Sequence, residues 1–536
     1  MSAIPFSRDK ITNRSGVQLL SVVDNAGRGP QSNSDQVFAT IGRFTRGPID
    51  RAFAVDASNR TRSLGAPNSV LASPLNEAHI QLYEALGAGA FQACVSRLVP
   101  ESAVNKFMVA SPVSVEGLWS VETVLPAEYL IAVKHLECFS DGVRIGIHAV
   151  AQVDAQGAPA ASSMVKVRLI DIANNEPLFD DFEGSLLVAS KDEFGQSNYL
   201  PSVASSLTDL VEITVQGTSV PVGGEFYGVD ENGDEKWVFA DLNYFSEGGT
   251  TYSNTDYDAA IQRLYDTEIQ YGYLHAGGSQ NVALLSKLVA FAYKVNKTFP
   301  FDVPGDLSVE GAIAFMANLN IDSHYPQAYW APLQADDPLN GGKAILGTSG
   351  IQIGLRCNRN AQTDANDVPP KHYPVAGINY PVTRTGIRQL RKLSDPQLEA
   401  LAKAKINPVV FETYASGGRY VFRDSLTCAK TSGDKKLASV AEMSASVDDM
   451  VTAFAKECLQ LPMAECVRRM TQYIEKSFEA LETAGWFVPS AEMKGAAYMA
   501  TITPNARYPK EKMDVRYAIS YQGVGRVITV QQTLSK

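Results

Sequence analysis

The stretch from Thr255 to Leu333 constrains the fold of this chain more than any other. Apolar residues recur there at helical spacing over 256–268, 280–296 and 308–318, and short strand-like apolar runs separate these at 271–274, 299–303 and 328–333. Strands that alternate with helices at this spacing are typical of a parallel sheet covered by helices on both faces. We therefore expect an α/β domain here, with Thr255 and Asp258 capping its first helix and Ser308 its third.

The preceding section has a different pattern. Between about residues 105 and 245 the apolar runs are short and separated by turn residues, as at 143–153, 165–172 and 210–215. This spacing predicts an all-β unit, a sandwich-like insertion. Farther upstream, the sequence predicts a strand at 37–44, a helix at 76–86 and a buried strand at 91–99.

A helix and a hairpin are expected after the α/β stretch. The helix, at 395–404, has Ser394 as its N-cap and Gln397 as the capping-box partner, and we expect Pro408 to end it. A strand-turn-strand pattern over 409–422 then predicts a hairpin.

Two amphipathic helices are predicted in the C-terminal part. The first covers 447–460 and is preceded by Ser446, and the second covers 463–484 and is followed by Gly485 as a C′ residue. Their apolar stripes are typical of helices that pack on a core.

The end of the sequence alternates between apolar and polar residues from Lys512 to Ser520, which predicts a strand with one buried face. A break at Gly523 and Gly525 follows, and then a second strand-like run from Arg526 to Leu534. A terminal β segment with a free edge is a template for pairing with another molecule. Taken alone, the segment could equally be tucked into its own sheet.

Composition excludes several classes of function. At 536 residues the chain suggests three or four domains, and its net charge of −11 argues against a nucleic-acid binder. The amino terminus lacks the apolar core of a signal peptide, and no run of about 18 apolar residues predicts a membrane span. The six scattered cysteines and six histidines show no zinc spacing, so we expect free thiols and no metal. No nucleotide-binding motif is present.

One pattern suggests catalysis. Gly347–Gly350 reads Gly-Thr-Ser-Gly, like the nucleophile turn of subtilisin-type proteases, with Ser349 as the nucleophile. Such an enzyme needs an upstream histidine and aspartate. His275 is the candidate histidine, but its surrounding motif is missing and no Asp-Thr-Gly or Asp-Ser-Gly precedes it. We therefore expect Ser349 to be inert.

Short blocks spread over the chain carry a resemblance to a known family. They include Ile41–Pro48 (IGRFTRGP), Ser63–Pro67 (SLGAP), Tyr83–Leu98, Asn198–Pro201 (NYLP), Asp302–Pro304 (DVP), Ala328–Pro332 (AYWAP) with Asp337-Pro338, Ser349-Gly350, and Gly417–Thr427 (GGRYVFRDSLT). In this order they resemble the tail sheath proteins of contractile-tailed bacteriophages over nearly the whole chain.

The resemblance implies a subtilisin-like, catalytically inert α/β domain, a β-sandwich-like outer domain, an α+β C-terminal domain that faces the tube, and extended terminal arms. The implied divisions are the N-terminal arm at 1–35, the first part of the core domain at 36–104, the β-rich outer domain at 105–245, the α/β domain at 246–411, the C-terminal domain at 412–522 and the C-terminal arm at 523–536.

Strand exchange between subunits is expected in both arms. The residues assigned to it are Val17, Leu19, Leu20, Val22, Val527, Ile528, Thr529 and Val530. Gly523 and Gly525 would act as the hinge. Arg468, Arg469 and Lys476 on the helix at 463–484 are candidates for contact with the tube, or else belong to a solvated face.

The function that the resemblance implies is mechanical. The chain would be a non-enzymatic virion subunit without a cofactor, assembled in the host cytoplasm into stacked rings around the tail tube. Its partners would be copies of itself, the tail tube protein, and the baseplate and tail terminator proteins. Three alternatives remain: a sheath of a related injection machine (pyocin-like or type VI secretion), a subtilisin-type hydrolase, and a monomeric two-domain binding module.

Overall fold

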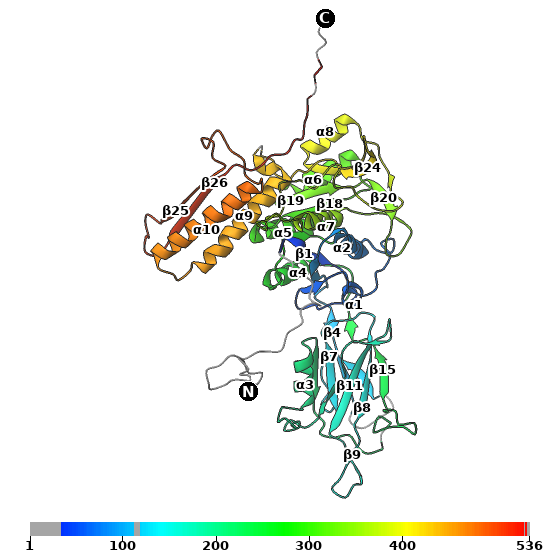
Figure 1. The fold of residues 1–536 in the computed structure, drawn as a ribbon. Coiled ribbons are helices and arrows are strands. Elements are labelled where there is room, and N and C mark those ends of the chain that lie inside the picture. The colour runs from blue at the N-terminus through cyan, green and yellow to red at the C-terminus, as the bar shows by residue number, and fades with distance from the viewer. Residues whose placement is uncertain (1–33, 112–117, 224, 432, 530, 533–536) are drawn as a thin grey trace, which may run out of the picture.

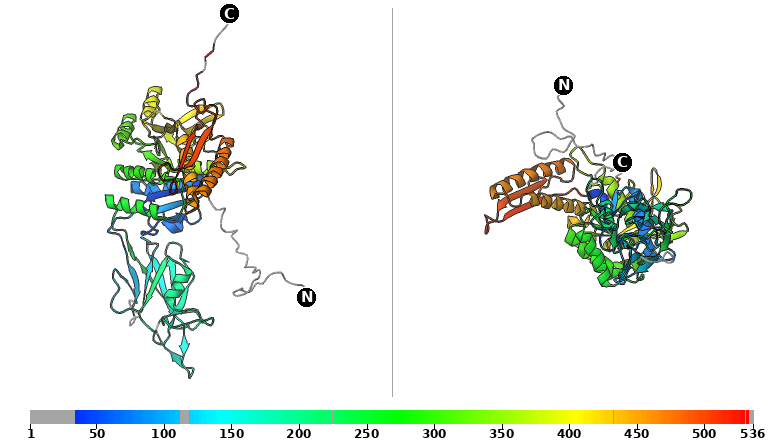
Figure 2. Two further views of the ribbon diagram at one scale, coloured as in Figure 1. Left: turned by 90° about the vertical axis from the view of Figure 1, so that its left-hand side faces the viewer. Right: turned by 90° about the horizontal axis from the view of Figure 1, so that it is seen from below.

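The computed structural model describes residues 34–111, 118–223, 225–431, 433–529 and 531–532. Figure 1 shows three parts: an α/β body, a β-rich domain below it, and two long helices with a two-stranded sheet at its side. The two further views in Figure 2 show the same three parts from other sides. None of the helices within these ranges is long and apolar enough to cross a bilayer.

Eight strands form the main sheet of the body. In spatial order they are β2 (Phe53–Val55), β3 (Gln92–Arg97), β1 (Val37–Gly42), β17 (Tyr273–His275), β18 (Phe299–Val303), β19 (Pro326–Trp330), β23 (Ile406–Tyr414) and β24 (Gly417–Phe422). The strands from β3 to β23 run parallel, and a single bridge between Tyr273 and Thr298 joins β17 to β18. β2 and β24 pair antiparallel at the two ends. The predicted parallel sheet is therefore confirmed.

Helices cover both faces of this sheet. On one face lie α4 (Asn254–Asp266), α5 (Val282–Val295) and α6 (Val309–Leu319), and on the other lie α2 (Glu77–Ala88) and α7 (Ser349–Asn360). Leu264, Leu285 and Met316 share a buried cluster with the strand residues Phe299 and Phe301. The doubly wound arrangement follows from these two buried layers.

The capping predictions had different outcomes. Ser308 caps α6 as predicted, since its Oγ accepts from the Gly311 amide at 3.0 Å. The prediction of Thr255 and Asp258 as caps of α4 was wrong. Ser253 is the N-cap, and the Asp256 carboxylate accepts from its backbone amide at 2.7 Å. Both members of this capping box lie two residues upstream of the predicted pair, so the helix begins earlier.

The β-rich domain is a sandwich, as predicted. One sheet contains β5 (Phe107–Ala110), β6 (Trp119–Glu122), β7 (Ile131–His135) and β14 (Val211–Val215), and the other contains β8 (Val143–Ala149), β11 (Met164–Asp171), β12 (Glu176–Pro177), β13 (Phe182–Ser185) and β15 (Val238–Leu242). Their inner faces share one buried cluster. The pair β4 (Val104–Asn105) and β16 (Phe245–Ser246) carries the two connections to the body, and the hairpin β9 (Gln152–Val153) and β10 (Pro159–Ala160) lies at the far tip in Figure 1.

Smaller elements complete these two parts. They are α1 (Arg60–Leu64), α3 (Leu200–Leu207), the 3-10 turns Ser34–Gln36, Pro74–Asn76 and Asp434–Lys436, and a three-stranded sheet of β20 (Leu333–Asp336), β21 (Lys343–Ile345) and β22 (Arg388–Gln389).

The helix predicted at 395–404 is α8 (Asp395–Lys403), with the expected capping box of Ser394 and Gln397. The prediction that Pro408 ends it was wrong. Lys405 adopts a left-handed φ of 62°, so the chain turns there and Pro408 lies inside β23. The predicted hairpin is confirmed as β23 and β24.

The two long helices are α9 (Ala438–Glu457) and α10 (Met463–Thr483), which Gly485 follows with a φ of 81°. Ser446 was predicted to precede the first helix, and this was wrong. It lies in the middle of α9, where its Oγ donates to the Glu442 carbonyl at 2.9 Å. The first eight residues of α9 are all buried, so they lack the one-sided apolar stripe on which the prediction depended.

The predicted terminal strand is confirmed as β26 (Met513–Ile519). It pairs antiparallel over seven residue pairs with β25 (Tyr498–Pro504), a strand that was not predicted. One face of this sheet packs on α10 through Tyr498, Tyr517 and their alternating neighbours. Figure 2 shows the sheet lying along the helix pair, to one side of the body.

Candidate functional site

Ser349 lies at the N-terminus of α7 and contacts two of the residues that a protease site would use. Its Oγ lies 2.9 Å from Nε2 of His275, and it donates a hydrogen bond to the Asp302 carboxylate. The sequence pattern pointed to His275 but not to Asp302, which lies in β18. A serine, a histidine and an aspartate therefore meet at the carboxyl ends of the parallel strands.

The proton positions are wrong for a Ser–His nucleophile pair. Nδ1 of His275 accepts from the Gly277 amide at 3.2 Å and lies 3.1 Å from Oγ1 of Thr40. Burial lowers the pKa of His275 to about 3, so the ring is neutral and carries its single proton on Nε2. Nε2 then donates to Ser349, whereas a general base must accept the proton of the serine.

Burial also separates this serine from substrates. Ser349 and His275 are each 1% exposed, and Asp302 is 2% exposed. The carboxylate of Asp302 accepts from the amides of Thr348 and Ser349 at 2.7 and 3.0 Å, so it caps the free amides of α7. In this arrangement the Asp302 carboxylate acts as the N-terminal cap of α7.

Side chains from α2 complete the cap. Glu77 accepts from the Gly347 amide and Gln81 accepts from the Gly350 amide, both at 2.7 Å. Burial and the nearby Asp302 raise the pKa of Glu77 to about 7, and burial raises the pKa of Asp302. These contacts fix α7 between α2 and the main sheet.

A second candidate site is the sheet formed by β25 and β26. Both strands pair only with each other among the residues that the structure describes, so each leaves one backbone edge without a strand partner. The outer face is solvent-exposed, with Met499 at 56%. A two-stranded sheet with two free edges can accept a further strand on either side.

The C-terminal segment leaves the body beside this sheet, where Figure 1 shows it running away from the other elements. Val527 and Ile528 are 86% and 84% exposed, and Thr529 is also exposed. None of these three lies in a strand in the described chain. A side chain at Gly523 or Gly525 would meet open space, and neither residue has a left-handed φ, so sterics alone do not require glycine there.

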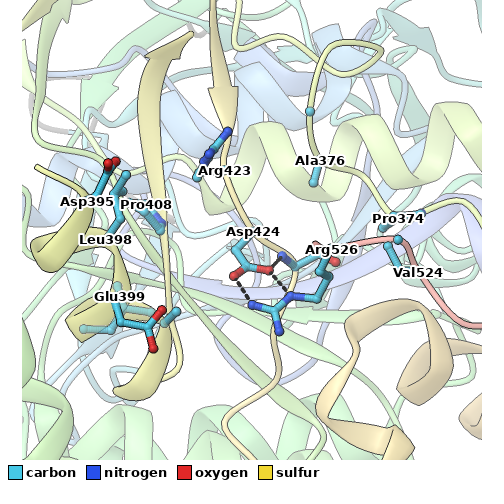
Figure 3. Close-up of a pocket in the computed structure, with 15 residues that line it drawn as sticks. Pro374, Ala376, Asp395, Leu398, Glu399, Pro408, Arg423, Asp424, Val524 and Arg526 are labelled. Atoms are coloured by element: carbon cyan, nitrogen blue, oxygen red, sulfur yellow. Dashed lines mark hydrogen bonds and ion pairs between the residues drawn. The ribbon is translucent and has the colours of Figure 1, made fainter. Parts of the chain in front are cut away.

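Before it leaves, this segment is held to the body. Nε and Nη2 of Arg526 donate to the Asp424 carboxylate at 2.9 and 2.5 Å. Figure 3 shows this pair at a cavity of about 530 Å³, with Asp395 and Glu399 of α8 on the opposite wall. The ion pair fixes the point from which the terminal segment departs.

The predicted tube-contact residues lie on α10, but two of them are already paired. Arg468 and Arg469 donate to Glu465 at 2.6 and 2.7 Å, and these hydrogen bonds lower the pKa of Glu465 to about 2. Lys476 lines a different cavity, beside Trp486. All three cations lie on α10, and their role in tube contact stays a prediction.

Several predicted residues cannot be placed. Val17, Leu19, Leu20, Val22 and Val530 lie outside the described residues.

All six cysteines are buried free thiols. No cluster of three potential metal-ligating side chains occurs in the described ranges.

Comparison with solved structures identifies the fold. The sheath tail protein Lin1278 from Listeria innocua aligns over 93% of this chain and 97% of its own, with a TM-score of 0.54 and 11% identity. The sheath tail protein DSY3957 from Desulfitobacterium hafniense covers 92% of this chain and 98% of its own (TM-score 0.48, 12% identity). The sheath complex of PVC, an extracellular contractile injection system, covers 52% of this chain and 75% of its own (TM-score 0.43, 14% identity).

No protein-family model matches the sequence, and no curated protein does. The alignment with Lin1278 spans nearly the whole of both chains. At the level of the fold, the resemblance to tail sheath proteins drawn from the sequence is therefore confirmed.

Proposed function

We propose that this chain is a structural subunit of a contractile phage tail sheath. Copies of it polymerise around the tail tube as stacked rings, and the lattice shortens to drive the tube through the host envelope for genome delivery. The observation that carries the proposal is the two-stranded sheet of β25 and β26, whose outer edges have no strand partner in the described chain.

The free edges account for assembly. A strand donated by a neighbouring subunit would form backbone hydrogen bonds along β25 or β26, each worth about 0.5–1.5 kcal/mol net. Val527 and Ile528 are β-branched and exposed, which suits a donated strand. Val17, Leu19, Leu20 and Val22 would serve in the same way from the other end, together with Thr529 and Val530.

The source of mechanical work is the difference in free energy between two packings of the same subunit. The sequence contains no nucleotide-binding motif, so hydrolysis does not supply the energy in this proposal. Head-to-tail contacts that do not close produce a filament, and rigid-body movement between subunits can change its length. Strands linked across subunits keep neighbours connected during this movement, with Gly523 and Gly525 as the hinge.

The body would serve as a rigid unit rather than as an enzyme. The capped arrangement at Ser349 supports this role, because the residues that resemble a subtilisin site are occupied in fixing α7. We accordingly propose a catalytically inert, subtilisin-like domain at 246–411, joined to 36–104, with the β-rich domain at 105–245 facing outward.

Contact with the tube would involve the C-terminal domain at 412–522. Arg468, Arg469 and Lys476 remain the proposed contact residues. Because Glu465 already neutralises part of the charge of the two arginines, the contact would be weak, as release of the tube during contraction requires. The other proposed partners are the baseplate and tail terminator proteins, and the site of assembly is the host cytoplasm.

Deletion of residues 524–536 tests the proposal. The truncated chain should fold and remain monomeric, whereas the full chain forms sheath-like polymers, as seen by negative-stain electron microscopy and light scattering. The segment adds little to the fold, since the ion pair of Arg526 with Asp424 is partly exposed and worth about 0.2–1 kcal/mol.

The matched control keeps the arm and its apolar character. Exchanging the two side chains, Val527→Ile with Ile528→Val, should leave polymerisation unchanged. Normal polymers from the truncated chain would contradict strand exchange through the C-terminal arm, and a full chain that stays monomeric at every concentration would contradict the sheath function itself.

A further inference from the structure

The first half of α9 is linked to the roots of both terminal segments, to the N-terminal one through Lys371 and to the C-terminal one directly. We propose that its residues Glu442–Asp449, here called the joint, couple the two arms of one subunit, so that a displacement at the root of one arm is transmitted to the root of the other. This inference rests on the proposed function, because it assumes that both arms bind neighbouring subunits. It concerns the path between them within a single protomer.

The root of the N-terminal arm is Asp35, which is held from two directions. Nζ of Lys371 lies 2.5 Å from the Asp35 carboxylate and donates to Oγ of Ser446 at 2.7 Å. The side-chain amide of Asn360, at the end of α7, donates to the Asp35 carbonyl at 3.0 Å. The Lys371 side chain is only 2% exposed, so its ammonium group links the arm root to α9 in a buried site.

The root of the C-terminal arm reaches the same part of α9. The hydroxyl of Tyr517, in β26, donates to the carboxylate of Asp448, and the side chain of Tyr521 lies beside Ser444. The backbone amide of Gln522 donates to the Trp486 carbonyl at 2.8 Å. Two contacts at the root of the terminal segment thus fall on α9 within two residues of Ser446, at Ser444 and Asp448.

Charged side chains fix the joint to the α/β body. Glu442 pairs with Arg359 of α7 and accepts from the hydroxyl of Tyr273 in β17, and all three are buried. At the other end, the carboxylate of Asp449 pairs with Lys297 and accepts from Asn296. The Glu442–Arg359 pair is buried and resists separation, because either partner alone would be an uncompensated buried charge.

The spacing makes transmission effective. The joint is eight residues of one helix, which spans about 12 Å at about 1.5 Å per residue. Three sets of contacts alternate along this short length. Ser446 is linked to the N-terminal root, Ser444 and Asp448 contact the C-terminal root, and Glu442 and Asp449 contact the body. A shift of the helix at one contact therefore changes the geometry at the others.

The experiment measures this coupling in the unassembled full-length protein by hydrogen exchange. Lys371→Met removes the link between Asp35 and Ser446. Position 371 is far from β26 in the sequence. Amides of residues 513–522 should then exchange about tenfold faster, because α9 loses a buried constraint at the joint. The coupling is reciprocal, so Tyr517→Phe should accelerate exchange at residues 34–37.

Lys343→Met is the matched control. It removes a lysine that pairs with Asp336 at 2.5 Å in the sheet of β20 and β21, so exchange at residues 513–522 should stay at the wild-type rate. If Lys371→Met does not fold, Ser446→Ala removes only the step onto α9 and should give the same acceleration. Unchanged exchange at residues 513–522 in a folded variant would overturn the joint.

The two proposals can fail separately. A wild-type chain that never polymerises contradicts the sheath function, whatever its exchange rates. Polymers from the wild type together with unchanged exchange in Lys371→Met contradict the joint alone.

Discussion

The buried carboxylate of Glu77 gives a test of the capped arrangement at α7. Its pKa in the folded protein is about 7, against an ordinary value near 4.5. Between these two pH values the folded state binds more protons than the unfolded state, so stability falls as the pH rises through this window. At about 1.4 kcal/mol per pH unit, the contribution of Glu77 decreases by about 3 kcal/mol between pH 4.5 and 7 and is constant above that.

Glu77→Gln removes this dependence while it preserves the cap. The amide oxygen can accept from Gly347 and Gln81 as the carboxylate does. Glu77 also borders a cavity of about 240 Å³, where water can accept from the new amide group. We expect the variant to be about 2–3 kcal/mol more stable than the wild type at pH 8 and about equal to it at pH 4.5.

Urea unfolding at the two pH values measures this difference. Glu128→Gln is the control, since it neutralises an exposed carboxylate and should change the free energy of unfolding little at either pH. A Glu77→Gln variant that is less stable than the wild type at pH 8, or that differs from it equally at both pH values, would refute the buried-carboxylate account.

Three further predictions concern α7 and α10. Ser349→Ala should cost about 1–3 kcal/mol of stability, because it leaves the buried Nε2–H of His275 unpaired and removes one donor to the buried Asp302 carboxylate. A fluorophosphonate probe should not label the native protein at Ser349. Gly354→Ala should destabilise the fold by about 1–3 kcal/mol in thermal unfolding, because a Cβ there would lie 2.4 Å from the Ala85 carbonyl of α2. Reversing the charges of Arg468 and Arg469 to glutamate should weaken sheath-on-tube assembly at low salt without changing the fold, as sedimentation of the complexes would measure.

Local periodicity predicted much of this fold. The helices between residues 254 and 330 and the terminal strand each bury one face in a regular pattern. The strands β17, β18 and β19 are buried at every residue, and they were found as short apolar runs between those helices. The missed strand β25 alternates in the same way, with Met499 and Thr501 exposed between half-buried neighbours. The sequence pattern at 498–504 could therefore have predicted β25.

The start of α9 could not be found from periodicity. Its first residues include Ala438, Ala441 and Glu442, all buried, so no polar face marks a helix. Glu442 is buried there because Arg359 and Tyr273 supply its partners from positions far away in the chain. A carboxylate is expected at the surface unless a partner is known.

The site at Ser349 likewise depends on contacts that the sequence pattern alone could not predict. The motif pointed to Ser349 and His275, and they meet, but it could not supply Asp302, which lies 47 residues from the serine. Nor does a motif determine the tautomer of His275, which depends on the amide of Gly277 and on burial. The chemistry of these groups follows from the tertiary contacts rather than from the motif.

The arrangement of buried charge bears on how such a subunit could move. Glu77, Asp302 and Arg384 lie inside the body and cap or brace α7, and Glu442 pairs with Arg359 between the body and α9. Because separating buried charges is costly, deformation within the body is strongly opposed. By contrast, the edges of β25 and β26 and the exposed segment after Tyr521 have few such constraints. Movement would therefore concentrate at the strands between subunits, which is where the proposed lattice requires it.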